Sequence, residues 1–273
     1  MELSVERGFK IAVCGKGGVG KTLIAGTLAR LLARRGFRVL AIDVDSNPNL
    51  HSVLGVKLDT PLKPIVDNEL LVEERTGARP GDLGVFFTLN PRVDDIPDKY
   101  SIVSPDGIKL LVIGMPRARL GCMCPQNAIV RALVDHIVLD RSEVVILDME
   151  AGLEHFGRGT ARGVDYLLIV MEPTLKSLET AKRSLFLARE LGISRVWCVL
   201  NKVRSSEEVD YIVKKALDLE LHVKALIPYD TNVETAELLG VSILDYNKNS
   251  PFVLAVDKLC HYLLNDWYRN ISH

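Results

Sequence analysis

The stretch from Cys14 to Thr22, which reads CGKGGVGKT, brings glycines, two lysines and a hydroxyl group together in this 273-residue sequence. Its spacing fits the pattern GxxxxGK[ST], in which glycines allow backbone N–H groups to close around a triphosphate. In that pattern Lys21 reaches the β- and γ-phosphates, and the Thr22 hydroxyl ligates Mg²⁺. The residues predicted to bind phosphate are Gly15, Lys16, Gly17, Gly18, Val19, Gly20, Lys21 and Thr22.

The segments on either side of this loop have the character of a strand and a helix. Residues 9–13 form an apolar run, and residues 23–33 repeat apolar side chains at a spacing that covers one side of a helix. A helix that begins directly after the loop would direct its positive dipole end at the bound phosphates. These flanks favour nucleotide binding over the alternative, a glycine-rich turn without a ligand.

Two acids, Asp43 and Asp45, directly follow the next apolar run, residues 38–42. Ligand-binding groups gather at the carboxyl ends of parallel strands, so these acids would lie within reach of the phosphate loop. The alternative is a pair of solvated loop acids that accept nearby backbone N–H groups.

A second strand with an acidic end follows in residues 144–148, whose last residue is Asp148. Such a strand has the form of a Walker B motif, in which Asp148 would hold Mg²⁺ through water. Gly152, in the turn that follows, would respond to the γ-phosphate as part of a switch. A buried strand with a capping Asp is the alternative.

Two cysteines separated by one residue, Cys122 and Cys124, lie in a loop that opens a predicted helix over 126–139. A thiol beside a helix N-terminus has a lowered pKa, and Arg117 and Arg119 would favour the thiolate further. One chain offers two thiolates, whereas Zn²⁺ usually takes four ligands. A twofold dimer whose loops meet would supply all four; a redox pair and incidental thiols are the alternatives. The other cysteines, in apolar patterns typical of a core, are Cys14, Cys198 and Cys260.

Alternating apolar strands and helices predict an α/β fold of three layers, with a mostly parallel central sheet flanked by helices. We expect one phosphate-loop ATPase domain over residues 1–273, with an irregular, proline-containing insertion around 55–106. Within and after this insertion, residues 85–89 and 109–113 have the apolar character of strands.

The composition sets limits on location and partners. Lys and Arg number 34 and Asp and Glu 35, so the net charge of −1 provides no overall basic field for nucleic acid or an anionic membrane. The N-terminus lacks a signal-peptide pattern, and no apolar run approaches the roughly 18 residues that span a bilayer. An odd number of cysteines, 5, indicates reduced thiols. We therefore expect a cytoplasmic protein with no nucleic-acid and no membrane partner.

The run KGGVGKT, with Lys16 directly after the first glycine of the loop, resembles the deviant loop of the MinD, ParA and nitrogenase-iron-protein ATPases. This resemblance implies a homodimer in which Lys16 crosses to the nucleotide of the partner subunit. It also implies that Asp43 supports the Mg²⁺ shell and that Asp45 orients the attacking water. The expected catalytic residues are Lys16, Lys21 and Asp45.

Two later segments resemble the base-binding elements of this superfamily. Asn201 and Lys202 follow the apolar run 195–200, but Arg204 stands where guanine specificity requires Asp, so ATP is expected in preference to GTP. The residues that correspond to the second adenine-flanking segment are Pro228, Tyr229 and Asp230.

Over nearly the whole chain, the motifs resemble those of the CooC-type ATPases, which assist nickel insertion into carbon monoxide dehydrogenase. The order is KGGVGKT, DVDSNP, GCMCP, LDMEAGLEHFGRGTARGVD, NKV and IPYD. The resemblance implies that Cys122 and Cys124 of two subunits bind one nickel or zinc ion, with ATP, ADP and Mg²⁺ as cofactors and carbon monoxide dehydrogenase as the client. Two departures, Leu23 for Thr and Glu150 for Gly or Pro, bear on nucleotide affinity and hydrolysis rate.

The sequence leaves two other functions open. A MinD-like or ParA-like spatial regulator would bind membrane or DNA, but the tail LCHYLLNDWYRNISH carries only Arg269 in place of a basic amphipathic helix. An electron-transfer ATPase with a [4Fe–4S] cluster would have more widely spaced cysteines than Cys122 and Cys124.

Overall fold

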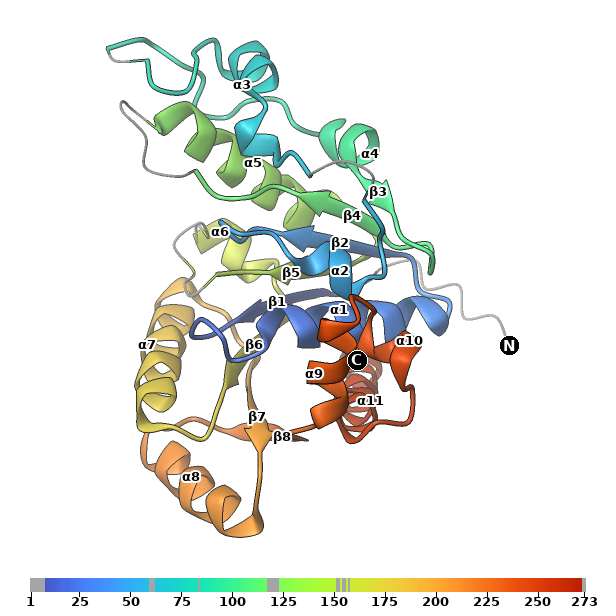
Figure 1. Cartoon of the computed structure of the whole chain (residues 1–273). Coiled ribbons are helices and arrows are strands. Elements are labelled where there is room, and N and C mark those ends of the chain that lie inside the picture. The colour runs from blue at the N-terminus through green and yellow to red at the C-terminus, as the bar shows by residue number, and fades with distance from the viewer. Residues whose placement is uncertain are drawn as a thin grey trace.

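An eight-stranded sheet crosses the described part of the molecule, with helices on both of its faces (Figure 1). The computed structural model describes residues 8–58, 62–82, 84–116, 123–150, 153, 156 and 158–271. The strand order is β3-β4-β2-β5-β1-β6-β7-β8. The strands are β1 (Lys10–Cys14), β2 (Val39–Asp43), β3 (Ile102–Val103), β4 (Lys109–Val112), β5 (Val144–Asp148), β6 (Tyr166–Met171), β7 (Val196–Val203) and β8 (Val223–Pro228).

Neighbouring strands of this sheet are parallel, apart from the short β3, which pairs antiparallel with β4. Strands β1, β2 and β5 are buried along their whole length. This burial explains their unbroken apolar sequences, because parallel strands are covered on both faces. The prediction of a three-layer α/β fold with a mostly parallel sheet is confirmed.

The helices divide between the two faces of the sheet. Ile11 and Val13 of β1 pack with apolar residues of α1 and α11, whereas Ala12 and Cys14 pack on the opposite face with residues of α5 and α7. Successive side chains of a strand point to opposite faces, so β1 contributes to both cores. The helical segments are α1 (Lys21–Arg34), α2 (Leu50–Val53), η1 (Ile65–Asp67), α3 (Glu69–Thr76), α4 (Ile96–Tyr100), α5 (Cys124–Asp140), α6 (Arg158–Arg162), α7 (Leu175–Leu191), α8 (Ser206–Asp218), α9 (Thr231–Leu238), α10 (Ile243–Tyr246) and α11 (Pro251–Ile271).

The segment between β2 and β4 differs from the sequence prediction in one respect. Residues 85–88 form no strand, and the Phe86 side chain is 99% exposed. The edge of β4 that a further strand would need is occupied by β3, and Thr88 instead donates its N–H to the carbonyl oxygen of Thr76. An apolar run becomes a strand only where it finds a partner edge, so the expected strand over 85–89 was wrong, while that over 109–113 is present as β4.

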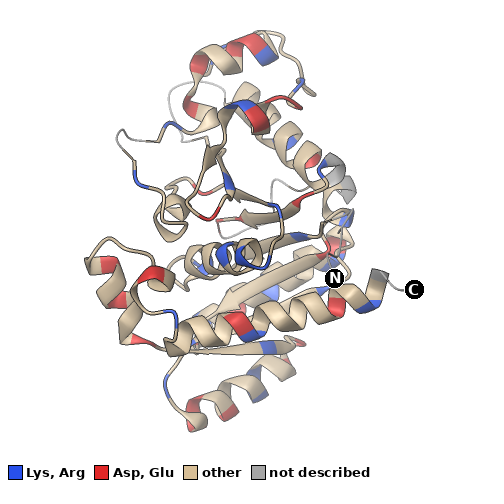
Figure 2. Cartoon of the chain, turned by 90° about the vertical axis from the view of Figure 1, so that its right-hand side faces the viewer, with Lys and Arg blue, Asp and Glu red and all other residues tan. Residues whose placement is uncertain are grey.

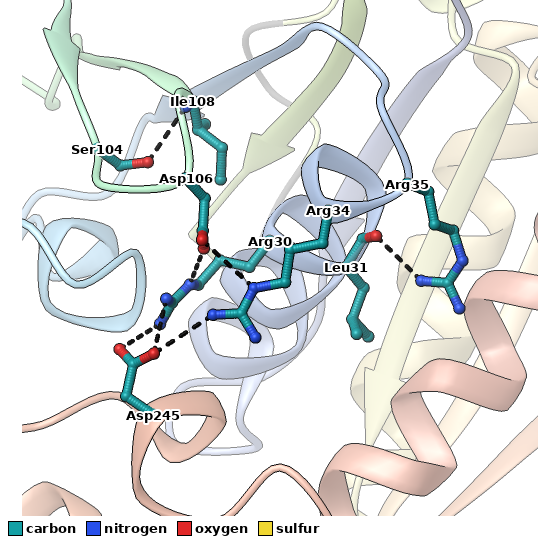
Figure 3. A network of polar contacts seen from close by, with 8 residues as sticks. All are labelled: Arg30, Leu31, Arg34, Arg35, Ser104, Asp106, Ile108 and Asp245. Atoms are coloured by element: carbon teal, nitrogen blue, oxygen red, sulfur yellow. Dashed lines mark hydrogen bonds and ion pairs between the residues drawn. The ribbon is translucent and has the colours of Figure 1, made fainter. Parts of the chain in front are cut away.

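A charged network joins α1, which begins at the phosphate loop, to two distant segments (Figure 3). The Arg30 guanidinium, 2% exposed, lies 2.5 Å from Asp106 in the β3–β4 turn and 2.7 Å from Asp245 of α10. Arg34 reaches both carboxylates at 3.3 Å but is 38% exposed. Hydrogen bonds to Asp245 and Asp106 outweigh the burial that would lower the pKa of Arg30, so its pKa is raised.

Arg30→Met is expected to lower the free energy of unfolding by about 3 kcal/mol, because it removes the buried guanidinium that contacts both Asp106 and Asp245. Arg34→Met is the matched control, and its loss should stay below about 1 kcal/mol, since exposed ion pairs contribute little. Urea unfolding of both variants measures the difference. Equal losses for the two would contradict a special role for the buried guanidinium.

Charged residues of both signs occur together on one side of the described structure. Figure 2 shows Lys and Arg interspersed with Asp and Glu on the side that faces the viewer. No helix among the described residues is both long enough and apolar enough to pass through a membrane.

Candidate functional site

The loop between β1 and α1 has the backbone conformation that its glycines were expected to allow. Gly15, Gly18 and Gly20 have φ values of 139°, 80° and 96°, which residues with a Cβ rarely adopt. A Cβ on Gly15 would lie 2.1 Å from the carbonyl oxygen of Val170, at the end of β6. A Cβ on Gly17 or Gly18 would meet no atom within 4 Å. The loop is therefore packed against the sheet at Gly15 and open at Gly17 and Gly18, as a phosphate cradle requires.

The two lysines of the loop differ in their surroundings. Lys21, the first residue of α1, is 6% exposed, and its ammonium lies 3.3 Å from the carbonyl oxygen of Lys16. The Lys16 side chain is half-buried and makes no ion pair or hydrogen bond with another described residue. Lys21 thus lies within its own loop, whereas Lys16 remains available to a group from outside.

Asp43 and Asp148 meet at the carboxyl edge of the sheet. They are register partners in the parallel pair β2–β5, and both are buried, at 0% and 1% exposure. Asp43 accepts the backbone N–H groups of Leu50, at 2.9 Å, and Asp45, at 3.1 Å. Neither carboxylate oxygen of Asp148 accepts a hydrogen bond in the described part of the chain.

Burial raises the pKa of both acids, to about 6 for Asp43 and to about 7 for Asp148. The backbone donors Leu50 and Asp45 oppose the rise at Asp43, and the nearby Thr22 hydroxyl opposes it at Asp148 without making a full hydrogen bond. Two buried carboxylates beside each other repel when both are ionised, and a cation held between them relieves that repulsion. Oxygen donors from Thr22, Asp43 and Asp148 match the preference of Mg²⁺, so these residues fit a magnesium site.

Asp148→Asn should change the pH dependence of stability in protein free of nucleotide and divalent cations. A raised folded-state pKa means that the carboxyl group contributes stability below its unfolded pKa, near 4, and loses it as pH rises toward 7. The variant should therefore equal the wild type near pH 4 and exceed its free energy of unfolding by about 4 kcal/mol at pH 8, because each unit between the folded and unfolded pKa corresponds to about 1.4 kcal/mol. Urea unfolding at both pH values tests this, with Asp210→Asn on the surface of α8 as the control. A difference that is independent of pH would contradict the assignment.

Asp45 lies in a more open turn than the acid pair. Its carboxylate accepts the Asn47 N–H at 2.8 Å, a local turn of the kind considered as the alternative for this residue. Asp45 is half-buried, directly after the acid pair. The structure thus separates the two neighbouring acids: Asp43 is buried beside Asp148, and Asp45 faces the more accessible side.

Asn201 and Lys202, expected at the base, contact the phosphate loop itself. The Asn201 amide donates to the carbonyl oxygen of Val19 at 2.8 Å, and the Lys202 ammonium donates to that of Gly18 at 2.6 Å. Lys202 has a φ of 60°, unusual for a residue with a side chain. Its ammonium also lies 3.8 Å from Glu172, which sequence reasoning missed although it follows a strand, β6, as the predicted acids do.

The second expected base segment adjoins the first. The guanidinium of Arg204 lies 4.0 Å from the ring centroid of Tyr229, and the Tyr229 N–H donates to the carbonyl oxygen of Val203. Pro228 is the last residue of β8. The carboxylate of Asp230 caps α9 through the Asn232 N–H at 2.9 Å and holds the start of α11 through the Phe252 N–H at 3.0 Å. Asp230 therefore orients this segment, and its oxygens are already bound within the chain.

The segment that follows β4 and leads toward the cysteines leaves the sheet beside the same acids. The N–H groups of Ile113 and Gly114, just after β4, donate to the carbonyl oxygen of Asp43 at 2.9 and 3.2 Å. Cys124 is the first residue of α5, and the Gln126 amide in that first turn donates to Val66 of η1 at 2.9 Å. Cys122 and Gly152 lie outside the described residues. The other cysteines are buried, as expected: Cys14, Cys198 and Cys260.

Comparison with known proteins accords with this geometry. The family model for the CobQ/CobB/MinD/ParA nucleotide binding domain matches residues 10–243. The chain is 47% identical to the carbon monoxide dehydrogenase accessory protein CooC of Rhodospirillum rubrum over 240 residues, which cover 87% of this chain and 90% of that protein. It is 46% identical to the ATP-binding protein MJ0823 of Methanocaldococcus jannaschii over 261 residues, 94% of this chain and 98% of the relative.

Solved structures agree on the fold. The septum site-determining protein MinD of Pyrococcus horikoshii, in complex with Mg-ADP, has a TM-score of 0.67 and 21% identity, with coverage of 94% of this chain and 96% of that chain. The cell division ATPase MinD of Pyrococcus furiosus has a TM-score of 0.68 and 24% identity, with coverage of 94% and 99%. The phosphate loop, the strand order and these matches agree: the chain belongs to the CobQ/CobB/MinD/ParA family of nucleotide-binding proteins and is a CooC-like ATPase within it.

Proposed function

We propose that this protein is an ATP-dependent, dimeric maturation ATPase that carries a nickel or zinc ion on paired cysteines and assists nickel insertion into carbon monoxide dehydrogenase. One observation carries the proposal. The expected nucleotide site and the segment that leads to the cysteines both start at the same edge of the sheet. The acid pair and the phosphate loop lie at that edge, and the segment leading to Cys124 begins there, bonded to the Asp43 carbonyl oxygen. The 47% identity to the accessory protein CooC supports the client.

The phosphate loop would bind the nucleotide, and side chains from β7 hold that loop in place. The backbone N–H groups of residues 15–22 and the Lys21 ammonium would hold the phosphates, and Asn201 and Lys202 keep the loop in place through Val19 and Gly18. The adenine would lie between the segment that contains Lys202 and the segment Pro228–Asp230. Thr22, Asp43 and Asp148 would hold Mg²⁺, which supplies charge neutralisation to the phosphates when bound.

ATP hydrolysis needs cations that neutralise the phosphate charge and a group that orients the attacking water. Lys16, whose side chain makes no ion pair or hydrogen bond with another described residue, would reach the phosphates of the partner subunit, and Lys21 those of its own. Asp45, on the accessible side of the acid pair, would orient the attacking water and accept its proton. Developing negative charge on the transferred phosphoryl group would then face two ammonium groups.

The metal site requires two chains. Among the described residues, no group of three or more His, Cys, Asp or Glu side chains is arranged to hold a metal ion. Cys122 and Cys124 of each subunit would supply two thiolates, and the pair of subunits four, as a tetrahedral zinc site needs; a square-planar arrangement of the same thiolates would accept nickel.

The test measures two quantities under anaerobic conditions: the metal content per chain and the mass of the protein in solution. Both are measured once with ADP and once with a non-hydrolysable ATP analogue. We expect one ion per two chains and a dimer in the ATP-like state. A protein that stays monomeric and metal-free under both conditions would refute the proposal. Co-sedimentation with liposomes or DNA in the presence of ATP would instead indicate a spatial regulator.

ATP should bind at least about tenfold more tightly than GTP. Guanine is selected by a carboxylate that accepts its N1 and N2 hydrogens, and the residue at the corresponding place, Arg204, is a donor stacked on Tyr229. Competition of unlabelled ATP and GTP against a fluorescent ATP analogue measures the ratio. Equal competition would show that the base is selected elsewhere or not at all.

A further inference from the structure

Helix α2, which begins shortly after Asp43, lies against α1, the helix that starts at the phosphate loop (Figure 1). Gly26 of α1 provides the space for this contact. A Cβ on Gly26 would lie 2.6 Å from Cγ1 and 2.8 Å from Cβ of Val53, and 3.1 Å from Cδ1 of Leu50. The β-branched Val53 side chain has little rotamer freedom, so an added methyl group would push α2 away from α1. The bare Gly26 backbone therefore sets the distance between the two helices.

The chain that leaves α2 lies on the same face of α1. Arg30 follows Gly26 by four residues, so the two share one side of the helix. A Cβ on Gly55, just after α2, would lie 3.6 Å from Nη1 of Arg30 and 3.5 Å from Oδ2 of Asp245. The Arg30 guanidinium is itself fixed by its two carboxylate partners. Helix α2 is therefore held to one face of α1 along its whole length.

The start of α2 is tied to Asp43 through the turn that carries Asp45. One carboxylate oxygen of Asp43, Oδ2, accepts the N–H of Leu50 at 2.9 Å, and the other, Oδ1, accepts the N–H of Asp45 at 3.1 Å. The Asp43 carboxylate thus closes the turn over residues 45–50 at both ends. Inside the turn, the Asp45 carboxylate accepts the N–H of Asn47 at 2.8 Å. A shift of Leu50 away from α1 would stretch these hydrogen bonds or reorient Asp45.

The presence of glycine at this position of α1 has an energetic cost. Gly26 is buried in the interior of the helix, where glycine is less favourable than alanine by about 1 kcal/mol. Extra bulk in a packed core costs typically about 1 to 3 kcal/mol, however, and the contacts of an added Cβ are too short to be made without movement. Close packing of α2 therefore outweighs helix propensity at Gly26.

We propose that Gly26 is a positioning residue for ATP hydrolysis. It lets α2 lie close to α1, and α2 in turn fixes the turn that presents Asp45 to the attacking water. Gly26 acts through α2 and Asp43 without touching nucleotide or water itself. The inference rests on the proposed function, because it requires Asp45 to act on that water.

Gly26→Ala is expected to lower kcat for ATP hydrolysis by about 10- to 100-fold, because a misplacement of about 1 Å at a catalytic group can cost a hundredfold. Phosphate release at saturating ATP measures kcat. The affinity of the same variant for a fluorescent ATP analogue, measured without Mg²⁺, should stay within about twofold of wild type, since an interaction used only in the transition state changes kcat and not binding. Omitting Mg²⁺ removes the expected metal ligand Asp43 from this measurement.

A second substitution tests whether the methyl group acts through α2. Val53→Ala removes the side-chain atom nearest to the added methyl group. Gly26→Ala should therefore cost at least about threefold less in kcat when it is made in the Val53→Ala background than in the wild type. Where Gly26→Ala folds poorly, Leu50→Ala tests the same link from α2, and should lower kcat by at least about fivefold.

A matched control separates positioning from a general loss of stability. Ala181 of α7 is 1% exposed, so Ala181→Val overpacks the core away from α2. We expect it to lower the free energy of unfolding in urea while keeping the wild-type kcat. A loss of kcat equal to that of Gly26→Ala would show that overpacking anywhere in the core slows hydrolysis, and would overturn the inference.

The outcomes distinguish this inference from the proposed function. Wild-type protein that releases no phosphate from ATP, or an Asp45→Asn variant with the wild-type kcat, would overturn the proposed role of Asp45 and this inference with it. Hydrolysis that depends on Asp45 but keeps its rate in Gly26→Ala and Leu50→Ala would overturn the role of Gly26 alone. An equal loss from Gly26→Ala with Val53 and with Ala at that position would overturn the link through α2.

Discussion

Replacing Cys122 and Cys124 together by Ala is expected to remove zinc or nickel from the protein while leaving ATP binding by the monomer intact. Each chain then offers no thiolate to the shared site, and the affinity for Zn²⁺ should fall at least about a thousandfold, because structural zinc sites draw most of their binding energy from such ligands. Metal analysis after anaerobic gel filtration measures the content, and a fluorescent ATP analogue measures nucleotide affinity.

The buried cysteines provide the matched control for this experiment. Burial raises the pKa of Cys260 to about 11 and that of Cys198 to about 12, so both are held as neutral thiols in the core. Cys260→Ala should keep the full metal content with a modest loss of stability. Metal content that is unchanged in the double variant at Cys122 and Cys124, or lost in the Cys260 variant, would place the metal elsewhere.

Lys16→Ala is expected to lower kcat for ATP hydrolysis by about a thousandfold, with little change in nucleotide affinity of the monomer. The effect should resemble the loss of a cation that one protein chain supplies to the phosphoryl group bound by another. Such a cation raises kcat by about 10³- to 10⁵-fold. The structure supports this expectation, because the Lys16 side chain makes no ion pair or hydrogen bond with another described residue, whereas Lys21 is 6% exposed and lies against its own loop. Phosphate release under saturating ATP gives kcat, and equilibrium titration gives the affinity.

Lys21→Ala and Lys248→Ala complete the comparison. The Lys21 variant should lose nucleotide binding itself, because its ammonium belongs to the loop of its own chain. The Lys248 variant, in which an exposed lysine far along the chain is removed, should match the wild type in both measurements. A Lys16→Ala variant that hydrolyses ATP at the wild-type rate would show that no lysine acts across the two subunits.

The sequence alone predicted the elements whose chemistry is local. The run from Gly15 to Thr22 determines a loop, because glycines at three places adopt backbone angles that other residues disfavour. Apolar strands ending in acids placed Asp43 and Asp148 at the carboxyl edge of the sheet, since parallel strands share one direction. The apolar runs also predicted the buried strands β1, β2 and β5, whose side chains face helices on both sides.

Only the tertiary structure determined which of these groups meet. Strand order made Asp43 and Asp148 register partners and left both Asp148 oxygens without a hydrogen bond among the described residues. It brought Asn201 to the Val19 carbonyl oxygen and gave Asp230 a capping role at α9 and α11. It also left residues 85–88 without a partner edge, and it placed α2 against Gly26. Local sequence patterns indicate which secondary structure a segment prefers. The burial of a side chain and its hydrogen-bond partners depend on contacts between segments far apart in the chain. Those contacts set the pKa values of the acids and determine which functional residues lie together.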